Sequence, residues 1–215
     1  MSLRKSENIW VLSLFLGITG LLAALILALV SDMTAEPIRQ AKIKNELKML
    51  RRLELPEFDN NMTEKVFTVN GIRFMAATRE GKLVGLVAEA ATNRGYNGKM
   101  RSLISFDVSG NIKAVQIIEH NETPGLGAAV CERKFKKTIF NLFKAPPAGL
   151  PANAVLDQFN GKNASGSGNW KIVRDGGDFI YRTGATVSSR AVTDMVNRAA
   201  AEFTAAYTHF SKGTE

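Results

Sequence analysis

The first strong pattern in the chain is a long run of apolar and small residues near the N-terminus. Residues 9–30 contain no charged side chain, and about 22 residues in a helix are enough to cross a hydrocarbon layer of about 30 Å. A cleaved signal peptide has a shorter apolar core and a small-x-small cleavage site, whereas Leu29-Val30-Ser31-Asp32 offers no such site. The pattern therefore predicts one retained transmembrane helix.

A second helix is predicted directly after this run. Over residues 34–53 apolar side chains recur at near-helical spacing, and Pro37 falls where the first turn of such a helix tolerates proline. The apolar positions are Ile38, Ile43, Leu47, Leu50 and Leu53. Because Leu55-Pro56 ends the pattern, we expect this helix to lead from the bilayer to a folded domain.

Five apolar runs in the middle of the chain are typical of paired strands. Asn70-Gly71 separates the first two runs, and Asn-Gly favours the tight turns of two-stranded hairpins. Ser109-Gly110-Asn111 separates the last two runs in the same way. The expected strands are residues 66–69, 72–78, 83–91, 102–108 and 112–119.

The second half of the chain combines helices with irregular segments. Residues 128–143 and 189–207 have apolar positions at helical spacing. Residues 148–169 are rich in Gly, Asn and Ser and predict a surface insertion with little regular structure, and residues 170–173 predict one more strand. Strands in two meanders with helices at fixed points indicate an α+β domain, in which an antiparallel sheet has flanking helices.

Composition narrows the classes of partner and cofactor. The 215 residues carry a net charge of +8, but the positive side chains are dispersed and lack interleaved aromatic residues, so we expect membrane headgroups or acidic protein surfaces as partners and no nucleic acid. Cys131 is the only cysteine, which excludes an intrachain disulfide and a cysteine-ligated cluster built by this chain alone. We expect Cys131 to be a core residue, and we expect no metal site.

Candidate chemistry is concentrated at the start of the last helix. Thr183-Gly184-Ala185-Thr186 is followed by Val187-Ser188-Ser189, so that Ser188 or Ser189 is a candidate N-cap. The first N–H groups of a helix attract anions through hydrogen bonds and the helix dipole. The segment therefore offers a phosphate several donors and an esterifiable hydroxyl group at Thr186.

A second segment, His120-Asn121-Glu122-Thr123-Pro124-Gly125-Leu126-Gly127, is more elaborate than an ordinary turn requires, and Gly95-Tyr96-Asn97-Gly98 precedes a predicted strand. Together with the Thr-Gly-Ala-Thr motif, these segments resemble the FMN-binding domain family, in which a threonine at the end of a Ser/Thr-Gly-Ala-Thr motif carries FMN through a phosphoester bond. The form of the second segment resembles, more narrowly, the G subunits of the Rnf complex, a membrane-bound ferredoxin:NAD oxidoreductase that moves sodium ions or protons.

The resemblance implies that Thr186 carries covalent FMN and that the chain is an electron-relay component of a translocase, with no catalytic residue of its own. The implied cofactor-binding residues belong to the two motifs and are Glu122, Thr123, Gly125, Leu126, Gly127, Thr183, Gly184, Ala185, Val187 and Ser188. The implied partners are the other Rnf subunits, especially the integral-membrane subunits that carry flavin or hold an iron–sulfur centre, a flavin transferase during maturation, and the lipid bilayer. One position departs from the family, because Ile180 stands where the attachment signal usually has an acidic residue.

Individual roles follow for the second motif. Gly125 and Gly127 let the backbone approach the cofactor, Leu126 covers a face of the flavin ring, and Thr123 forms hydrogen bonds with polar atoms. His120, at the end of a strand, is expected to orient the loop by hydrogen bonding rather than to bind metal. Because no Gly-x-Gly-x-x-Gly follows a predicted strand, we do not expect direct hydride exchange with NAD.

The expected domain order is a short cytoplasmic tail at residues 1–8, a transmembrane helix at 9–30, a linking helix at 31–55 and an extracytoplasmic FMN-binding domain at 56–215. Lysine and arginine residues lie on both sides of the span, so charge leaves its orientation open. The resemblance implies the inner membrane of a bacterial or archaeal cell, with the domain outside the cytoplasm. Two alternatives stay open: the C subunit of a sodium-pumping NADH:quinone oxidoreductase, and a membrane-anchored ligand-binding or sensor module without redox chemistry.

Overall fold

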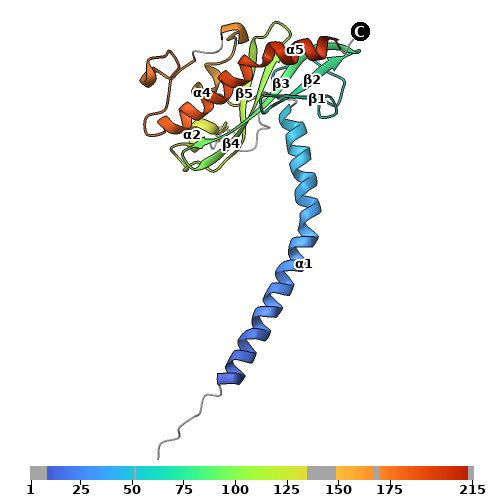
Figure 1. Ribbon diagram of the computed structural model, residues 1–215, viewed down its shortest axis with the longest axis vertical. Coiled ribbons are helices and arrows are strands. Elements are labelled where there is room, and N and C mark those ends of the chain that lie inside the picture. Colours follow the sequence, from blue (N-terminus) through green and yellow to red (C-terminus); the bar gives the residue numbers. More distant parts are fainter. Residues whose placement is uncertain (1–8, 51, 135–148, 167–169, 213–215) are drawn as a thin grey trace, which may run out of the picture. The chain divides into compact units, whose positions relative to one another are not determined.

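A computed structural model (Figure 1) describes residues 9–50, 52–134, 149–166 and 170–212. The chain divides into two compact units, Met1–Met49 and Leu50–Glu215. The described part of the first unit is a single helix. The second unit is a folded domain that contains every residue of the predicted cofactor site.

Helix α1, Ile9–Leu50, covers the predicted transmembrane helix and most of the second predicted helix, residues 34–53, as one continuous element. Its stretch Trp10–Ala41 is long and apolar enough, by length and composition, to cross a membrane, and this stretch is not buried within the chain. The placement of Pro37 in a first turn was wrong, because Pro37 lies inside α1. Proline removes one backbone hydrogen bond there, and the strong helix formers around it, such as Ala35 and Arg39, let the helix continue.

The folded domain is built on one antiparallel sheet with strand order β1-β2-β3-β4-β5. Both predicted hairpins are confirmed, and at the first of them Val69 pairs with Ile72 while Asn70 and Gly71 adopt φ angles of 47° and 76°, as a tight hairpin turn requires. The strands are β1 Val66–Val69, β2 Ile72–Arg79, β3 Lys82–Gly95, β4 Gly98–Asp107 and β5 Ile112–His120. β3 and β4 exceed their predicted lengths because their pairing continues to Gly95 and Gly98.

Both faces of the sheet are covered. Helices α4, Thr186–Ala201, and α5, Phe203–Lys212, lie over one face (Figure 1). The main core on this face includes Phe74, Leu86, Ile104, Phe106, Val192, Met195 and Val196. A smaller core on the other face includes Leu50, Leu53, Met62, Met75, Val87 and Leu103. Apolar side chains from both sides of β2, β3 and β4 are therefore buried, which explains their nearly continuous apolar sequences.

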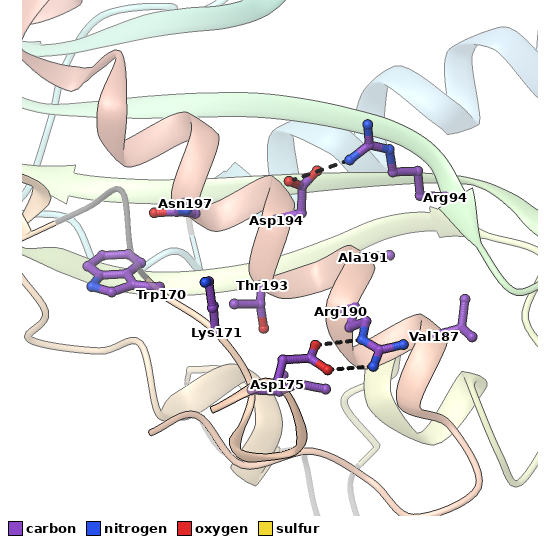
Figure 2. A pocket seen from close by; sticks show the side chains of 11 residues that line it. Arg94, Trp170, Lys171, Asp175, Val187, Arg190, Ala191, Thr193, Asp194 and Asn197 are labelled. Atoms are coloured by element: carbon purple, nitrogen blue, oxygen red, sulfur yellow. Dashed lines mark hydrogen bonds and ion pairs between the residues drawn. The ribbon is translucent and has the colours of Figure 1, made fainter. Parts of the chain in front are cut away.

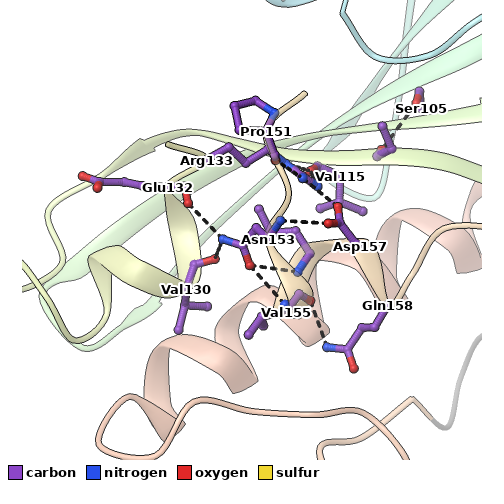
Figure 3. A network of polar contacts seen from close by, with 12 residues as sticks. Ser105, Val115, Val130, Glu132, Arg133, Pro151, Asn153, Val155, Asp157 and Gln158 are labelled. Carbon is purple, nitrogen blue, oxygen red and sulfur yellow. Dashed lines mark hydrogen bonds and ion pairs between the residues drawn. The ribbon is translucent and has the colours of Figure 1, made fainter. Parts of the chain in front are cut away.

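The helix predicted over residues 128–143 is much shorter than expected. Helix α2 spans only Ala128–Cys131, and the chain at Glu132 is extended. Shortly after α2, the side chain of Arg133 is only 3 % exposed. It donates to the carbonyl oxygens of Val115 and Pro151 and pairs with Asp157 at 2.6 Å (Figure 3). Leaving this buried guanidinium group without its partners would be costly, and that requirement outweighs local helical spacing. Residues 135–143 of the prediction lie outside the described residues.

The stretch predicted as a surface insertion, residues 148–169, contributes to the core where it is described. Helix α3, Ala154–Asp157, contributes Leu156 to the main core, the 3-10 turn η2, Ala164–Gly166, contributes Ala164, and the chain between them contributes Phe159. Asn153 accepts hydrogen bonds from the first N–H groups of α3 and donates to the carbonyl oxygens of Ala129, Val130 and Glu132 (Figure 3). One asparagine thus caps α3 and supplies a hydrogen-bond donor to the carbonyl groups at the end of α2.

The strand predicted at residues 170–173 is also wrong. Ile172 forms a single bridge with Phe179, and the chain between them turns through η3, Val173–Asp175, and Gly176, with φ of 81°. A side chain on Gly177 would overlap the carbonyl oxygen of Lys171, so only glycine lets the turn close this tightly. Ile172 is apolar because it is buried in the main core, not because it belongs to a strand.

Candidate functional site

The two sequence motifs meet around one cavity of about 490 Å³. Strand β5 ends at the second motif, the Thr-Gly-Ala-Thr motif leads into α4, and the turn between β3 and β4 closes a third side. The lining residues are Tyr96, Glu122, Thr123, Leu126, Gly127, Arg174, Gly184, Ala185, Thr186, Val187 and Ser188. Cavities of this size are typical of sites for small molecules and cofactors.

Most of the predicted cofactor-binding residues line this cavity, and two do not. Gly125 and Thr183 are exposed and outside the lining. Gly125 serves the turn instead, since its φ is 80° and its carbonyl oxygen accepts a hydrogen bond from Arg182 at 3.2 Å. Leu126 lines the cavity beside Gly184 and is 47 % exposed, so its side chain is accessible to a ligand.

Glu122 is the buried acidic group of the site. The residue is only 5 % exposed, and Oε2 accepts a hydrogen bond from Ser188 Oγ at 2.6 Å while Oε1 accepts one from the backbone N–H of Asn97 at 3.3 Å. Burying a carboxylate is costly unless donors surround it. Glu122 therefore connects the β3–β4 turn, the second motif and the first turn of α4, which sequence spacing did not reveal.

Gly127 makes this arrangement possible. A Cβ atom at Gly127 would lie 2.6 Å from Ser188 Oγ and closer still to Glu122 Oε2. Gly95 has the same relation to the other carboxylate oxygen, because its Cβ would lie 2.6 Å from Glu122 Oε1. The absence of these two side chains leaves room for the carboxylate. The sequence analysis instead expected Gly127 to let the backbone approach the cofactor.

Helix α4 begins three residues earlier than predicted, at Thr186. Its N-cap is Ala185, which has no side chain able to accept a hydrogen bond, so the proposed capping roles of Ser188 and Ser189 are wrong. Ser188 bonds to Glu122, and Ser189 Oγ donates to the carbonyl oxygen of Ala185 at 2.9 Å. An uncapped helix start beside a cavity presents N–H groups and a positive dipole end to an anion.

Arg174 is a lining residue that lies outside every motif singled out in the sequence. It belongs to η3, and its Nη1 donates to Thr186 Oγ1 at 3.1 Å. The residue comes well before the motif on a different element, and no spacing rule connects the two. The only sequence signal was a basic side chain in the approach to the motif, and that signal is common in a chain of this charge.

His120 and Cys131 have structural roles in the loop around the site. His120 Nδ1 accepts a hydrogen bond from the backbone N–H of Glu122 at 3.3 Å, which agrees with its expected role of orienting the loop. Cys131 is fully buried, and burial, reinforced by the charges of Glu122 and Glu132, raises the pKa of its thiol to about 12. The expectation that Cys131 is a core residue is confirmed.

Comparison with known proteins relates the site to a family. The model of the FMN-binding domain matches residues 95–201, which include the β3–β4 turn and both motifs. The G subunit of the ion-translocating oxidoreductase complex of Salmonella typhi is 30 % identical over 85 % of this chain and 82 % of its own length. The corresponding G subunit of Cereibacter sphaeroides is 31 % identical over 86 % and 80 %, and that of Escherichia coli strain K12 is 30 % identical over 85 % and 82 %. The chain therefore belongs to the family of ion-translocating oxidoreductase complex G subunits.

Proposed function

We propose that this chain is a membrane-anchored electron-relay component of an ion-translocating ferredoxin:NAD oxidoreductase complex and carries FMN covalently at Thr186. The observation that carries the proposal is the convergence of two motifs, distant in sequence, on one cavity beside the start of α4. FMN bound there supplies one- and two-electron chemistry. The alternative, the C subunit of a quinone reductase, is less well supported, because the similar proteins compared above are G subunits.

The described residues fit this cofactor in chemistry and in space. The uncapped N-terminus of α4 and the guanidinium group of Arg174 are suited to a phosphate. Leu126, exposed over the cavity, offers an apolar surface to a flavin ring, and Thr123 offers a hydroxyl group. In this proposal Glu122 does not contact the ring but holds the loop against α4 through Ser188.

Thr186 is the better attachment residue of the two threonines in the motif. It is partly buried, lines the cavity and occupies the first position of α4. Thr183 is exposed and lies outside the cavity lining. The hydroxyl group of Thr186 is thus held at the cavity by its place on α4 and by Arg174, whereas that of Thr183 is not part of the cavity wall.

In the domain order that we propose, the membrane span rests on the apolar part of α1, and the side of the membrane rests on the resemblance to the FMN-binding family. Residues 1–8 form a cytoplasmic tail, residues 9–30 cross the membrane once, residues 31–55 connect the span to the domain, and residues 56–215 bind FMN outside the cytoplasm. The partners are the integral-membrane subunits that carry flavin and hold an iron–sulfur centre, with a flavin transferase acting during maturation. Ion translocation belongs to the assembled complex.

In-gel fluorescence tests the proposal. The full chain is expressed in a host with an active flavin transferase, denatured and separated on a gel, and the band is examined for flavin fluorescence. Thr186→Ala should abolish the fluorescence and Thr183→Ala should retain it, because only the first removes the ordered hydroxyl. A wild-type band without fluorescence, together with an unmodified mass for the peptide containing Thr186, would refute the proposal and favour the non-redox binding module.

A further inference from the structure

Two consecutive residues of η3 contact two residues of α4 that lie one helical turn apart. Arg174 Nη1 donates to Thr186 Oγ1 at 3.1 Å. Asp175 accepts hydrogen bonds from Arg190 Nε and Nη2, both at 2.5 Å (Figure 2). Positions i and i+4 of a helix share a face, so the turn meets that face at two points.

The turn that carries these residues is fixed from its other side as well. Val173 N–H donates to the carbonyl oxygen of Phe179 at 2.8 Å, and Phe179 N–H donates to that of Lys171 at 3.1 Å. Phe179 is itself buried in the main core against Phe159. The backbone of η3 is therefore anchored to the core, and the ion pair sets its position against α4.

We propose that Arg174 binds the phosphate of the flavin at Thr186 and holds the Thr186 hydroxyl group for modification, and that Asp175 and Arg190 are positioning residues that hold Arg174 there. This inference rests on the proposed attachment of FMN. A guanidinium group only donates hydrogen bonds, so Arg174 occupies a lone pair of Thr186 Oγ and leaves the hydroxyl proton available to a base. The same planar group can then pair with the oxygens of the phosphate.

The modification needs no oxidant or reductant. Thr186 Oγ forms a bond to the phosphorus of the flavin mononucleotide, and the phosphoanhydride bond of an activated donor, a flavin dinucleotide, breaks. The nucleoside monophosphate leaves, and the hydroxyl proton passes to a base of the transferase. Negative charge accumulates on the phosphoryl oxygens during this step, where Arg174 and the helix start can stabilise it.

The cavity beside this contact provides matched controls (Figure 2). It is lined by Arg94, Trp170, Lys171, Asp175, Arg190 and Asp194, among others, and shares Val187 with the flavin cavity. Lys171 is exposed and belongs to the same segment as Arg174. Lys171→Ala thus removes one positive charge from the segment without removing the contact to Thr186.

The test measures the initial rate of flavin attachment. Unmodified full chain in detergent, from a host without flavin transferase, is incubated with the transferase and flavin adenine dinucleotide. Arg174→Ala should lower the rate about tenfold or more, the change that corresponds to loss of one charge-assisted hydrogen bond. Arg174→Lys should retain part of the rate, because lysine supplies charge without the planar pair of donors. Lys171→Ala should match the wild type.

The positioning role has its own test. Asp175→Arg and Arg190→Asp should each lower the rate, and the combined charge exchange should recover at least part of it. In the fully modified proteins, the phosphorus-31 resonance of the phosphodiester should move in Arg174→Lys and stay in Lys171→Ala. A role confined to stability would leave that resonance unchanged.

The outcomes are distinguishable. Modification of Arg174→Ala at the wild-type rate, or an equal loss in Lys171→Ala, overturns the role of Arg174 while the attachment of FMN stands. Failure of the charge exchange to recover any rate overturns the positioning role. If thermal unfolding shows that Arg174→Ala is not folded, the rate and the resonance of Arg174→Lys decide. A wild-type chain that is never modified refutes both this inference and the proposed function.

Discussion

Replacing Gly127 with alanine sets two physical effects against each other. Gly127 has φ of −62° and ψ of −36°, ordinary helical values that alanine adopts without strain. By backbone entropy alone, Gly127→Ala should stabilise the domain by about 0.4–1 kcal/mol. By packing it should destabilise the domain, because the new Cβ would lie 2.6 Å from Ser188 Oγ and 2.9 Å from Glu122 Cβ.

The packing effect should win. Making room means separating Ser188 Oγ from Glu122 Oε2, whose hydrogen bond is 2.6 Å long and buried. Hydrogen bonds to charged groups contribute about 1.5–3 kcal/mol, and overpacking a filled interior costs about 1–3 kcal/mol more. After the entropic gain is subtracted, we expect the free energy of unfolding to fall by about 2–5 kcal/mol.

Thermal unfolding of the full chain in detergent, followed by circular dichroism, measures this change. A loss of that size corresponds to a fall in Tm of at least about 4 °C for a domain of this length. Gly166→Ala is the control, because a Cβ there would meet no atom within 4 Å and its φ is not positive. Glu122→Ala provides a second background, in which Gly127→Ala should cost less because one of the two overlapping groups is gone. An unchanged or higher Tm in Gly127→Ala, relative to the wild type, would show that the carboxylate does not fill this space.

Three further predictions concern other parts of the domain. In a urea titration, Asn153→Ala should lower the free energy of unfolding by about 2–4 kcal/mol, since it removes a helix cap and leaves buried carbonyl groups without a donor. Asn153→Asp keeps only the cap, so its free energy of unfolding should fall by less. Cys131 should resist iodoacetamide at pH 8 in the folded chain and react rapidly in urea. In the folded chain a thiol with a pKa of about 12 leaves only about one molecule in 10⁴ as the reactive thiolate. Equal labelling in both states would contradict its burial. The hydrogen bond from Arg190 lowers the pKa of Asp175 below its unfolded value, so the stability that this ion pair contributes is present above the unfolded pKa and is lost as pH falls through the folded pKa. The difference in Tm between wild type and Arg190→Ala should therefore be constant from pH 8 to about 5 and shrink below about pH 4. A difference that changes between pH 8 and 6 would point to another group.

Features encoded by neighbouring residues could be predicted from the sequence. The first hairpin depends on Asn70-Gly71, whose positive φ values are a local property, and the sheet order then follows from short connections between successive strands. The same is true of the uncharged run in α1, whose length alone indicates a membrane span. The α+β class could be predicted because it rests on such local signals.

Features that depend on distant partners could not be predicted. The end of α2 is decided by Arg133, which leaves helical geometry to reach Val115 and Asp157, and both the end of α2 and the start of α3 depend on hydrogen bonds of Asn153. The buried contact between Glu122 and Ser188 joins residues 66 positions apart. Periodicity reports which side chains are apolar, but it does not report which buried polar groups find each other.

The site residues in the two motifs and Arg174 differ in kind. The motifs identify the flexible glycines and the hydroxyl groups around the start of α4, but they give no account of charge. Glu122 places a carboxylate behind this helix start, and a phosphodiester at Thr186 would add a second anion in front of it. Like charges at one helix end repel each other, and the dipole of α4 offers only about half an elementary charge to offset them. Among the described residues that line the cavity, Arg174 is the cation that can balance the second anion. The charge arrangement of the site therefore requires a residue outside both motifs, which is why neither motif could reveal it.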